Sequence, residues 1–182
     1  MPETRLPITV AGQSLDALAA AIGERRLPPV DRWDPPLCGH SGMRIAADGR
    51  WYHAGSPIER PAMVRLFGTV LRREADGTHV LVTPHEKLTI DVDLTPFRAI
   101  AMSQEGKGKD RRIAFELDSG DAVIAGAENP IRTIDGTPRL LVRHGLEALI
   151  ARPLYYELAE IALAEGHDPP GVWSDQCFFP LQ

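Results

Sequence analysis

The residues best suited to chemistry are concentrated between Asp31 and Leu71. This stretch brings together tryptophan, tyrosine, cysteine, histidine, proline and arginine residues. Each of these types needs a defined backbone geometry or a hydrogen-bond partner, so their density exceeds what a connecting segment requires. The stretch contains no catalytic or metal-binding signature. It therefore predicts a place for a ligand better than it predicts a reaction.

One thiol in this stretch has histidines near it in sequence. Cys38 precedes His40 by two positions, and His53 follows. A cysteine nucleophile needs a base within reach, so one alternative is a cytoplasmic hydrolase or thiol-dependent enzyme that uses Cys38 with His40 or His53. A Cys-x-His pair with no second ligand pair lacks the spacing of a structural zinc site. We expect no metal and no cofactor, a packed thiol at Cys38, and no bond between Cys38 and Cys177.

Arginines are the side chains best suited to an anionic ligand. The planar guanidinium group binds carboxylate and phosphate through paired hydrogen bonds. The arginines and aromatic residues are divided between two predicted domains. A ligand site at the seam between the domains, where small-molecule sites often form, would explain this division. The alternative is that the arginines pair with glutamates and pin the domains together. The candidate ligand-binding residues are basic or aromatic: Trp33, Arg44, Arg65, Lys87, Arg143, Tyr155 and Tyr156.

The composition is that of an ordinary soluble globular protein. The chain has 182 residues, 43% of them hydrophobic and 25% charged. A formal net charge of −5 argues against a nucleic-acid partner. No apolar run reaches the roughly 18–20 residues of a membrane span, and the N-terminus lacks a signal-peptide pattern. We expect a cytoplasmic protein with reduced cysteines and no membrane insertion.

The elements that must position these residues divide into two predicted domains. Residues 1–76 are predicted to form a small helix–hairpin–helix domain. Ser14 is a suitable N-cap for its first helix, and Pro61 fits the first turn of its second. Asp48-Gly49 is typical of the type I′ turn of a β-hairpin.

Residues 77–182 are predicted to form a bent antiparallel sheet closed by a helix over Pro153–Glu165. Short strands separated by turn signals are typical of a curled sheet or partial barrel. Seven strands and one helix are also the element count of a pleckstrin-homology-like domain, so the fold class is predicted to be α+β with a second domain superficially of that kind. The predicted strands are 78–83, 87–93, 97–102, 112–117, 121–125, 131–134 and 139–144.

Two segments of the chain resemble each other. Residues 49–58 and 171–181 each place a tryptophan two residues after a glycine, and a proline–aliphatic pair follows six or seven residues later. Either chance or an internal duplication explains this similarity. If duplication is the cause, each domain carries the same tryptophan-bearing strand and the C-terminal tail is docked.

Longer motifs extend from about Leu27 to the C-terminus. They are WDPPLCG at 33–39, MRI at 43–45, DGRWY at 48–52, GSPI at 55–58, LF at 66–67, LVTP at 81–84, EK at 86–87, VR at 142–143, GLEALIARP at 145–153 and YYEL at 155–158. With these motifs the chain resembles the bacterial domain of unknown function 1285 family. His85 departs from the family pattern, in which a small apolar residue is expected.

This resemblance implies a two-domain fold with repeated motifs, a candidate site between the domains that suits a nucleotide-like molecule, and a link to signalling. It implies no established activity. We therefore predict a non-catalytic module that binds a small anionic ligand at the interdomain seam. The enzyme, and an adaptor that binds a protein partner through an exposed apolar patch, stay open as alternatives.

Overall fold

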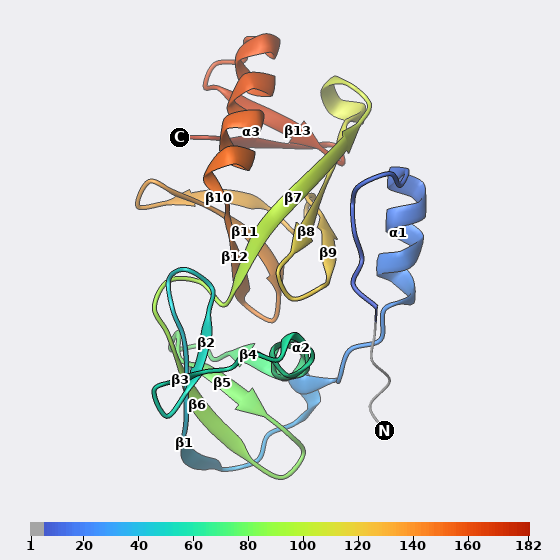
Figure 1. The fold of residues 1–182 in the computed structure, drawn as a ribbon. Coiled ribbons are helices and arrows are strands. Elements are labelled where there is room, and N and C mark those ends of the chain that lie inside the picture. The colour runs from blue at the N-terminus through green and yellow to red at the C-terminus, as the bar shows by residue number, and fades with distance from the viewer. Residues whose placement is uncertain (1–5) are drawn as a thin grey trace.

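The computed structural model describes residues 6–182, so the first five residues of the predicted first domain lie outside the described part. Two curled six-stranded sheets are stacked end to end, and three α-helices accompany them (Figure 1). The predicted α+β class is confirmed.

The first sheet has the strand order β3-β2-β1-β6-β5-β4. Helix α2 (Pro61–Thr69) lies between its strands β3 and β4 in the chain. The strands are β1 (Leu37–Ile45), β2 (Trp51–His53), β3 (Ser56–Pro57), β4 (Leu71–Arg73), β5 (His79–Val82) and β6 (Lys87–Val92).

The second sheet has the order β10-β11-β12-β7-β8-β9, and helix α3 (Arg152–Glu165) follows its last strand. A separate hairpin of β13 (Gly171–Ser174) and β14 (Cys177–Pro180) ends the chain. The strands of the second sheet are β7 (Phe97–Glu105), β8 (Arg112–Leu117), β9 (Ala122–Ile124), β10 (Ile131–Ile134), β11 (Thr137–Arg143) and β12 (Leu146–Ile150).

The division between the sheets corrects the predicted boundary at residues 76 and 77. Asp76 and Gly77 form the turn between β4 and β5, which pair antiparallel in the first sheet. The first sheet continues to Val92 and the second begins at Phe97. A composition change marked this position in the sequence, but a hairpin turn carries the same aspartate–glycine signal as a linker.

Both sheets are mixed, which corrects the expectation of a purely antiparallel sheet. β1 pairs parallel with β6, and β12 pairs parallel with β7. Each parallel pair joins two strands far apart in the chain at the centre of its sheet. The remaining described pairs are antiparallel, as expected from the short turns between consecutive strands.

The first helix belongs to the second sheet and not to the helix–hairpin–helix domain predicted for residues 1–76. Helix α1 (Leu15–Glu24) lies beside β8 and β9 (Figure 1). Its buried side chains, Leu15 and Leu18, form a small core with Ala114 and Ala122 on the outer face of that sheet. Amphipathic periodicity predicts which face of a helix is buried, but not which sheet buries it.

The ends of the three helices agree with the local capping signals in the sequence. The Ser14 hydroxyl accepts a hydrogen bond from the Ala17 N–H at 3.1 Å, as expected for an N-cap. Pro61 begins α2, and a proline also lies in the first turn of α3. Gly166 ends α3 in the left-handed conformation, at φ +68°.

The two similar segments adopt the same local structure. Residues 51–57 and 171–180 each form a hairpin with a tryptophan in the first strand. The two central turn residues have positive φ in both, at Ala54 and Gly55 and at Asp175 and Gln176, which is the type I′ pattern. The predicted hairpin around Asp48-Gly49 exists too, but only Gly49 has a positive φ, so its turn is not type I′.

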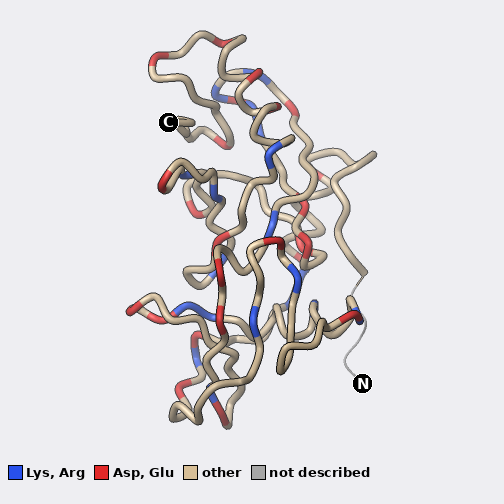
Figure 2. Tube along the Cα trace, turned by 60° about the vertical axis from the view of Figure 1, so that its left-hand side comes forward, with Lys and Arg blue, Asp and Glu red and all other residues tan. Residues whose placement is uncertain are grey.

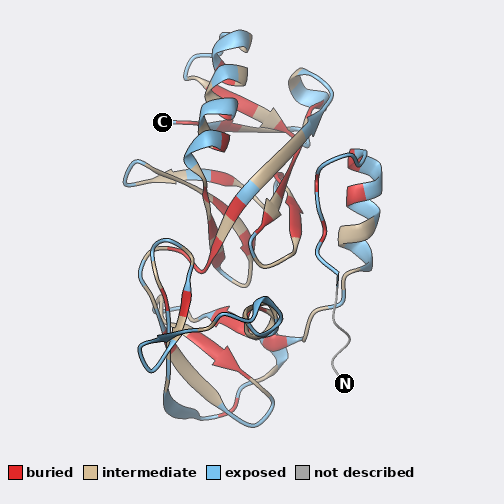
Figure 3. Cartoon of the chain, in the orientation of Figure 1, coloured by how far each residue is buried: buried red, intermediate tan, exposed pale blue. Residues whose placement is uncertain are grey.

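The C-terminal tail is docked against the second sheet. Ser174 is fully buried, accepts a hydrogen bond from the Ile113 N–H at 2.9 Å and donates one to the Ala125 carbonyl at 2.7 Å. Buried residues line the strands of both sheets (Figure 3), and those of the two sheets form one continuous apolar cluster.

Replacing Ser174 by alanine would leave a buried N–H and a buried carbonyl without their partner. We expect Ser174→Ala to lower the free energy of unfolding, measured by urea denaturation, by about 1–3 kcal/mol. Ser56→Ala, at an exposed position of the corresponding hairpin, is the control and should change it by less than about 0.5 kcal/mol. Equal losses in the two variants would contradict the bridging role of Ser174.

Candidate functional site

A cavity of about 770 Å³ lies between the C-terminal half of α1, the edge strand β9 and the loop over residues 126–129. Its position is beside the second sheet and not between the two sheets. Apolar side chains of α1 and β9 line it together with charged side chains. Its charged lining residues are Arg25, Arg112, Asp121, Glu128, Arg143 and Asp175.

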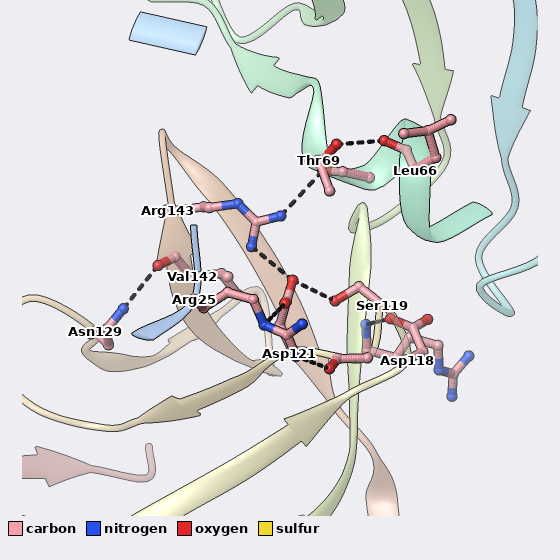
Figure 4. Close-up of polar contacts among 12 residues, drawn as sticks. Arg25, Leu66, Thr69, Asp118, Ser119, Asp121, Asn129, Val142 and Arg143 are labelled. Carbon is pink, nitrogen blue, oxygen red and sulfur yellow. Dashed lines mark hydrogen bonds and ion pairs between the residues drawn. The ribbon is translucent and has the colours of Figure 1, made fainter. Parts of the chain in front are cut away.

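Asp121 organises one end of this cavity (Figure 4). Its Oδ1 lies 3.4 Å from Nε of Arg25, and its Oδ2 lies 3.4 Å from an Nη of Arg143. The Ser119 hydroxyl donates to the same carboxylate at 3.3 Å. Nη2 of Arg25 donates to the carbonyls of Leu6 and Gly120, so this arginine links the N-terminal segment to the second sheet.

Arg143 connects this end of the cavity to the first sheet. Its second Nη donates to the Gly68 carbonyl, near the end of α2, at 3.1 Å, and its guanidinium lies 5.0 Å from the centroid of the Phe97 ring. Burial lowers the pKa of Arg143, while the nearby Asp121 carboxylate opposes that shift. A buried guanidinium needs such partners on every side.

Acidic side chains predominate at the other end. Arg112 pairs with Asp16 of α1 at 2.7 Å, and the Asp175 carboxylate lies close to Gly126, where a Cβ would stand 3.0 Å from Oδ2. Glu128 is exposed on the adjoining loop. The cavity therefore has a positive end and an acidic end, although charges of both signs are interspersed over the chain as a whole (Figure 2).

Of the candidate residues from the sequence, Arg143 lines the cavity and Arg65 lies close to it. A Cβ at Gly120 would stand 2.9 Å from Cδ of Arg65, which places this side chain against the turn before Asp121. Arg44 is elsewhere: its Nε donates to the Asp93 carboxylate at 3.0 Å, and more than half of its side chain is exposed.

Lys87 and Trp33 belong to a different polar cluster, on the first sheet. The Lys87 ammonium lies 3.8 Å from carboxylate oxygens of both Glu74 and Asp34. The guanidinium of the buried Arg72 also binds Glu74, and it donates to the Trp33 carbonyl at 2.7 Å. Trp33 thus contributes its backbone here.

The two tyrosines lie on α3, away from the cavity lining. The Tyr155 hydroxyl donates to the Leu181 carbonyl at 2.9 Å and helps to dock the tail. Tyr156 is 58% exposed. Adjacent helical residues point about 100° apart, so only one of the pair can face the core.

Cys38 and His40 of the enzyme alternative have separate hydrogen-bond partners. The Cys38 thiol is exposed and donates to the Pro36 carbonyl at 3.2 Å, so the expected packed thiol is not found. Nδ1 of His40 accepts a hydrogen bond from the Gly42 N–H at 2.8 Å, and its Nε2 lies 3.3 Å from Asp91. Cys177 is a free, half-buried thiol.

Sequence reasoning missed Arg25, Arg112 and Asp121 as cavity residues. Arg25 lies at the end of α1, where an arginine often binds the last helix carbonyls. Its guanidinium instead reaches the second sheet, and Arg26 donates to the Gly23 carbonyl of the helix.

Within residues 6–182, no group of three or more metal-binding side chains could hold an ion, and no helix is long and apolar enough to cross a membrane.

A second polar contact between the sheets surrounds β4 and β5. The Arg73 N–H donates to the His144 carbonyl at 3.2 Å, and Nδ1 of His144 lies 2.7 Å from Asp31.

Burial lowers the pKa of His79, and the nearby Arg73 lowers it further, whereas Glu147 on β12 opposes both effects. Folding therefore disfavours the protonated form of His79.

This lowered pKa predicts a loss of stability in mild acid. The unfolded chain, with the ordinary histidine pKa of 6.5, binds the proton more readily than the folded chain. The stability is present above about pH 6.5 and is lost as the pH falls toward the folded pKa. The free energy of unfolding of His79→Gln should fall less between about pH 7.5 and pH 5.5 than that of the parent. His85→Gln, at an exposed turn, should behave like the parent, and parallel curves for all three proteins would refute the role of His79.

Comparisons with known proteins agree with this architecture. Residues 28–95 match the N-terminal domain of a family described as a domain of unknown function, DUF1285, and residues 96–181 match its C-terminal domain. The two matched ranges meet where the two sheets divide. No match was found among curated proteins.

Two crystal structures are similar to the chain. A DUF1285 family protein from Silicibacter pomeroyi DSS-3 is 41% identical, with a TM-score of 0.80 over 94% of this chain and 96% of that one. A DUF1285 family protein from Shewanella baltica OS155 is 19% identical, with a TM-score of 0.54 over 66% of this chain and 92% of that one, a likeness of fold alone. The family matches over both domains, together with the 41% identical structure, show that the chain belongs to the DUF1285 family.

Proposed function

We propose that the protein is a non-catalytic module that binds a small molecule through a carboxylate or phosphate group, in the cavity beside β9. The observation that carries this proposal is the shared carboxylate of Asp121, which faces both Arg25 and Arg143. One carboxylate cannot neutralise two guanidinium groups. A ligand anion at this end of the cavity would balance the remaining positive charge.

The donors of both arginines support the same proposal. A guanidinium group carries five N–H donors on three nitrogens. The described contacts of Arg25 use Nε and one Nη, and those of Arg143 use its two Nη atoms. Each arginine therefore keeps donors for a further partner. The Asp121 contacts, at 3.4 Å, are also longer than the roughly 2.7–2.9 Å of strong charge-assisted hydrogen bonds, so a ligand oxygen competes with a weak contact.

The position of Arg143 provides a route to signalling. Arg143 lines the cavity, and its guanidinium donates to the Gly68 carbonyl of α2. A ligand that draws this side chain toward itself changes a hydrogen bond between the two sheets. Binding would in this way alter how the first sheet is held against the second.

The family resemblance supports a nucleotide-like ligand, and the volume of about 770 Å³ falls within the roughly 300–1,000 Å³ of small-molecule sites. We also take the second sheet, with α3 closing it, to be pleckstrin-homology-like in outline. A cytoplasmic location and the signalling role belong to this proposal as well.

Arg143→Lys tests the proposal, because lysine keeps the charge but loses the planar fork. We expect pyrophosphate, citrate or adenosine monophosphate to bind the parent in isothermal titration calorimetry. Loss of one charge-assisted hydrogen bond, about 1.5–3 kcal/mol, should weaken that binding by about tenfold to a hundredfold in Arg143→Lys.

Arg44→Lys is the matched control, because Arg44 is an exposed arginine that pairs with Asp93 outside the cavity lining. It should bind the same probe as tightly as the parent. Circular dichroism of each variant would establish that its fold is intact. Unchanged affinity in a folded Arg143→Lys, or equal weakening in both variants, would exclude the cavity as the anion site.

A further inference from the structure

The cavity follows the free edge of strand β9. Lining residues run without a gap from Asp121 to Ile124, and Gly126 continues them. The Arg25 and Arg143 end lies at Asp121, where β9 begins, and the Arg112 and Asp175 end lies at Gly126, beyond the end of β9. The cavity is thus an elongated groove whose wall is an unpaired strand edge.

The register of β8 and β9 identifies which peptide groups face this groove. The Leu117 N–H donates to the Asp121 carbonyl, and the Ala125 N–H donates to the Ile113 carbonyl. Alternate residues of an antiparallel strand bond to the same neighbour, so the residues between them turn their N–H and C=O groups away from β8. These residues are Ala122 and Ile124. Within residues 6–182, no backbone group of another segment bonds to either of them.

The charges at the two ends of the groove have opposite sign. At the β9 start, Arg25 and Arg143 share Asp121, which leaves a positive charge. At the far end, the Asp175 carboxylate lies beside Gly126, and the charge of Arg112 is already balanced by Asp16. Glu128, on the loop that follows Gly126, adds a second acidic group to the lining. A ligand with a carboxylate at one terminus and an ammonium at the other would be complementary to both ends.

The length of the groove selects the size of that ligand. Residues 121 and 126 are five positions apart, which is about 16 Å at roughly 3.3 Å per residue. Three extended residues span about 10 Å, and a hydrogen bond of about 3 Å at each terminus completes the distance. A tripeptide fits.

Resting on the proposed function of the cavity, we propose that its ligand is a short, extended peptide with free termini, bound as an additional antiparallel strand on β9. The peptide carboxylate lies at Arg25 and Arg143, and its ammonium lies at Glu128 and Asp175. Its backbone pairs with the outward peptide groups of Ala122 and Ile124. Addition of a strand to a free sheet edge is an established mode of peptide recognition. This inference keeps the anion site of the proposed function but replaces the nucleotide-like ligand that the family resemblance suggests, because a nucleotide offers neither the alternating backbone donors and acceptors nor the ammonium group.

Capped peptides test the two ends separately with the unmodified protein. Isothermal titration calorimetry would compare trialanine with N-acetyl-trialanine and with trialanine amide. We expect trialanine to bind, and each cap to weaken binding at least about tenfold, because each removes one charged partner. Equal affinity for the three peptides would overturn the proposed alignment.

Ligand methylation tests the strand pairing. Trialanine methylated on the nitrogen of its third residue keeps both termini but loses the N–H that faces Ala122, and we expect it to bind at least about tenfold more weakly. Methylation of the central nitrogen, whose N–H points away from β9, is the matched control and should leave the strand pairing intact. In the protein, Ile124→Pro removes the outward N–H of an edge strand, where proline is tolerated, while Ile124→Val keeps it. Ile124→Pro should weaken trialanine binding and Ile124→Val should not. If Ile124→Pro does not fold, the methylated peptide alone decides.

Two outcomes separate this inference from the function on which it rests. If pyrophosphate or citrate binds with dependence on Arg143 while trialanine does not bind, the peptide inference is overturned and the anion-binding module stands. If none of these probes binds, both are overturned.

Discussion

The need to partner one buried guanidinium constrains much of this structure. Arg143 lies on a strand of the second sheet, and its charge must be matched where little water reaches it. It is matched by Asp121, which directly precedes the edge strand β9 at the other end of the curled sheet, by the Gly68 carbonyl from α2 and by the ring of Phe97. Through Asp121, Arg25 and the whole N-terminal segment join the same contact. Two sheets and a distant helix are thereby fixed at a single point.

The position of α1 turns this contact into the end of a cavity. Helix α1 and the segment before it cover the outer face of β8 and β9 but leave the edge of β9 uncovered. Exposed strand edges are usually blunted or covered, because they pair readily with other chains. Here α1 and the loop over residues 126–129 flank the uncovered edge of β9 on either side of the cavity. This enclosure limits unwanted pairing with another sheet.

Local signals in the sequence predicted local structure well. The cap at Ser14, the proline at the start of α2 and the strands 112–117 and 131–134 agree with the structure because each depends on neighbouring residues only. Strand β12 was missed, since its leucine, glutamate and alanine favour helix, and its central place in the sheet overrides that preference. The parallel pairs, the location of α1 and the pairing of Arg25 with Asp121 depend on contacts between distant parts of the chain, which periodicity does not encode.

The location of α1 has a consequence for the order in which the chain assembles. The Val10 N–H binds the Glu116 carboxylate, 106 positions later in the chain. During synthesis, Leu15 and Leu18 therefore leave the ribosome long before the strands that bury them exist. A helix of ten residues is too short to be stable alone in water. The first sheet, complete at Val92, can form earlier. Helix α1 is thus made well before β8 and β9, which bury it.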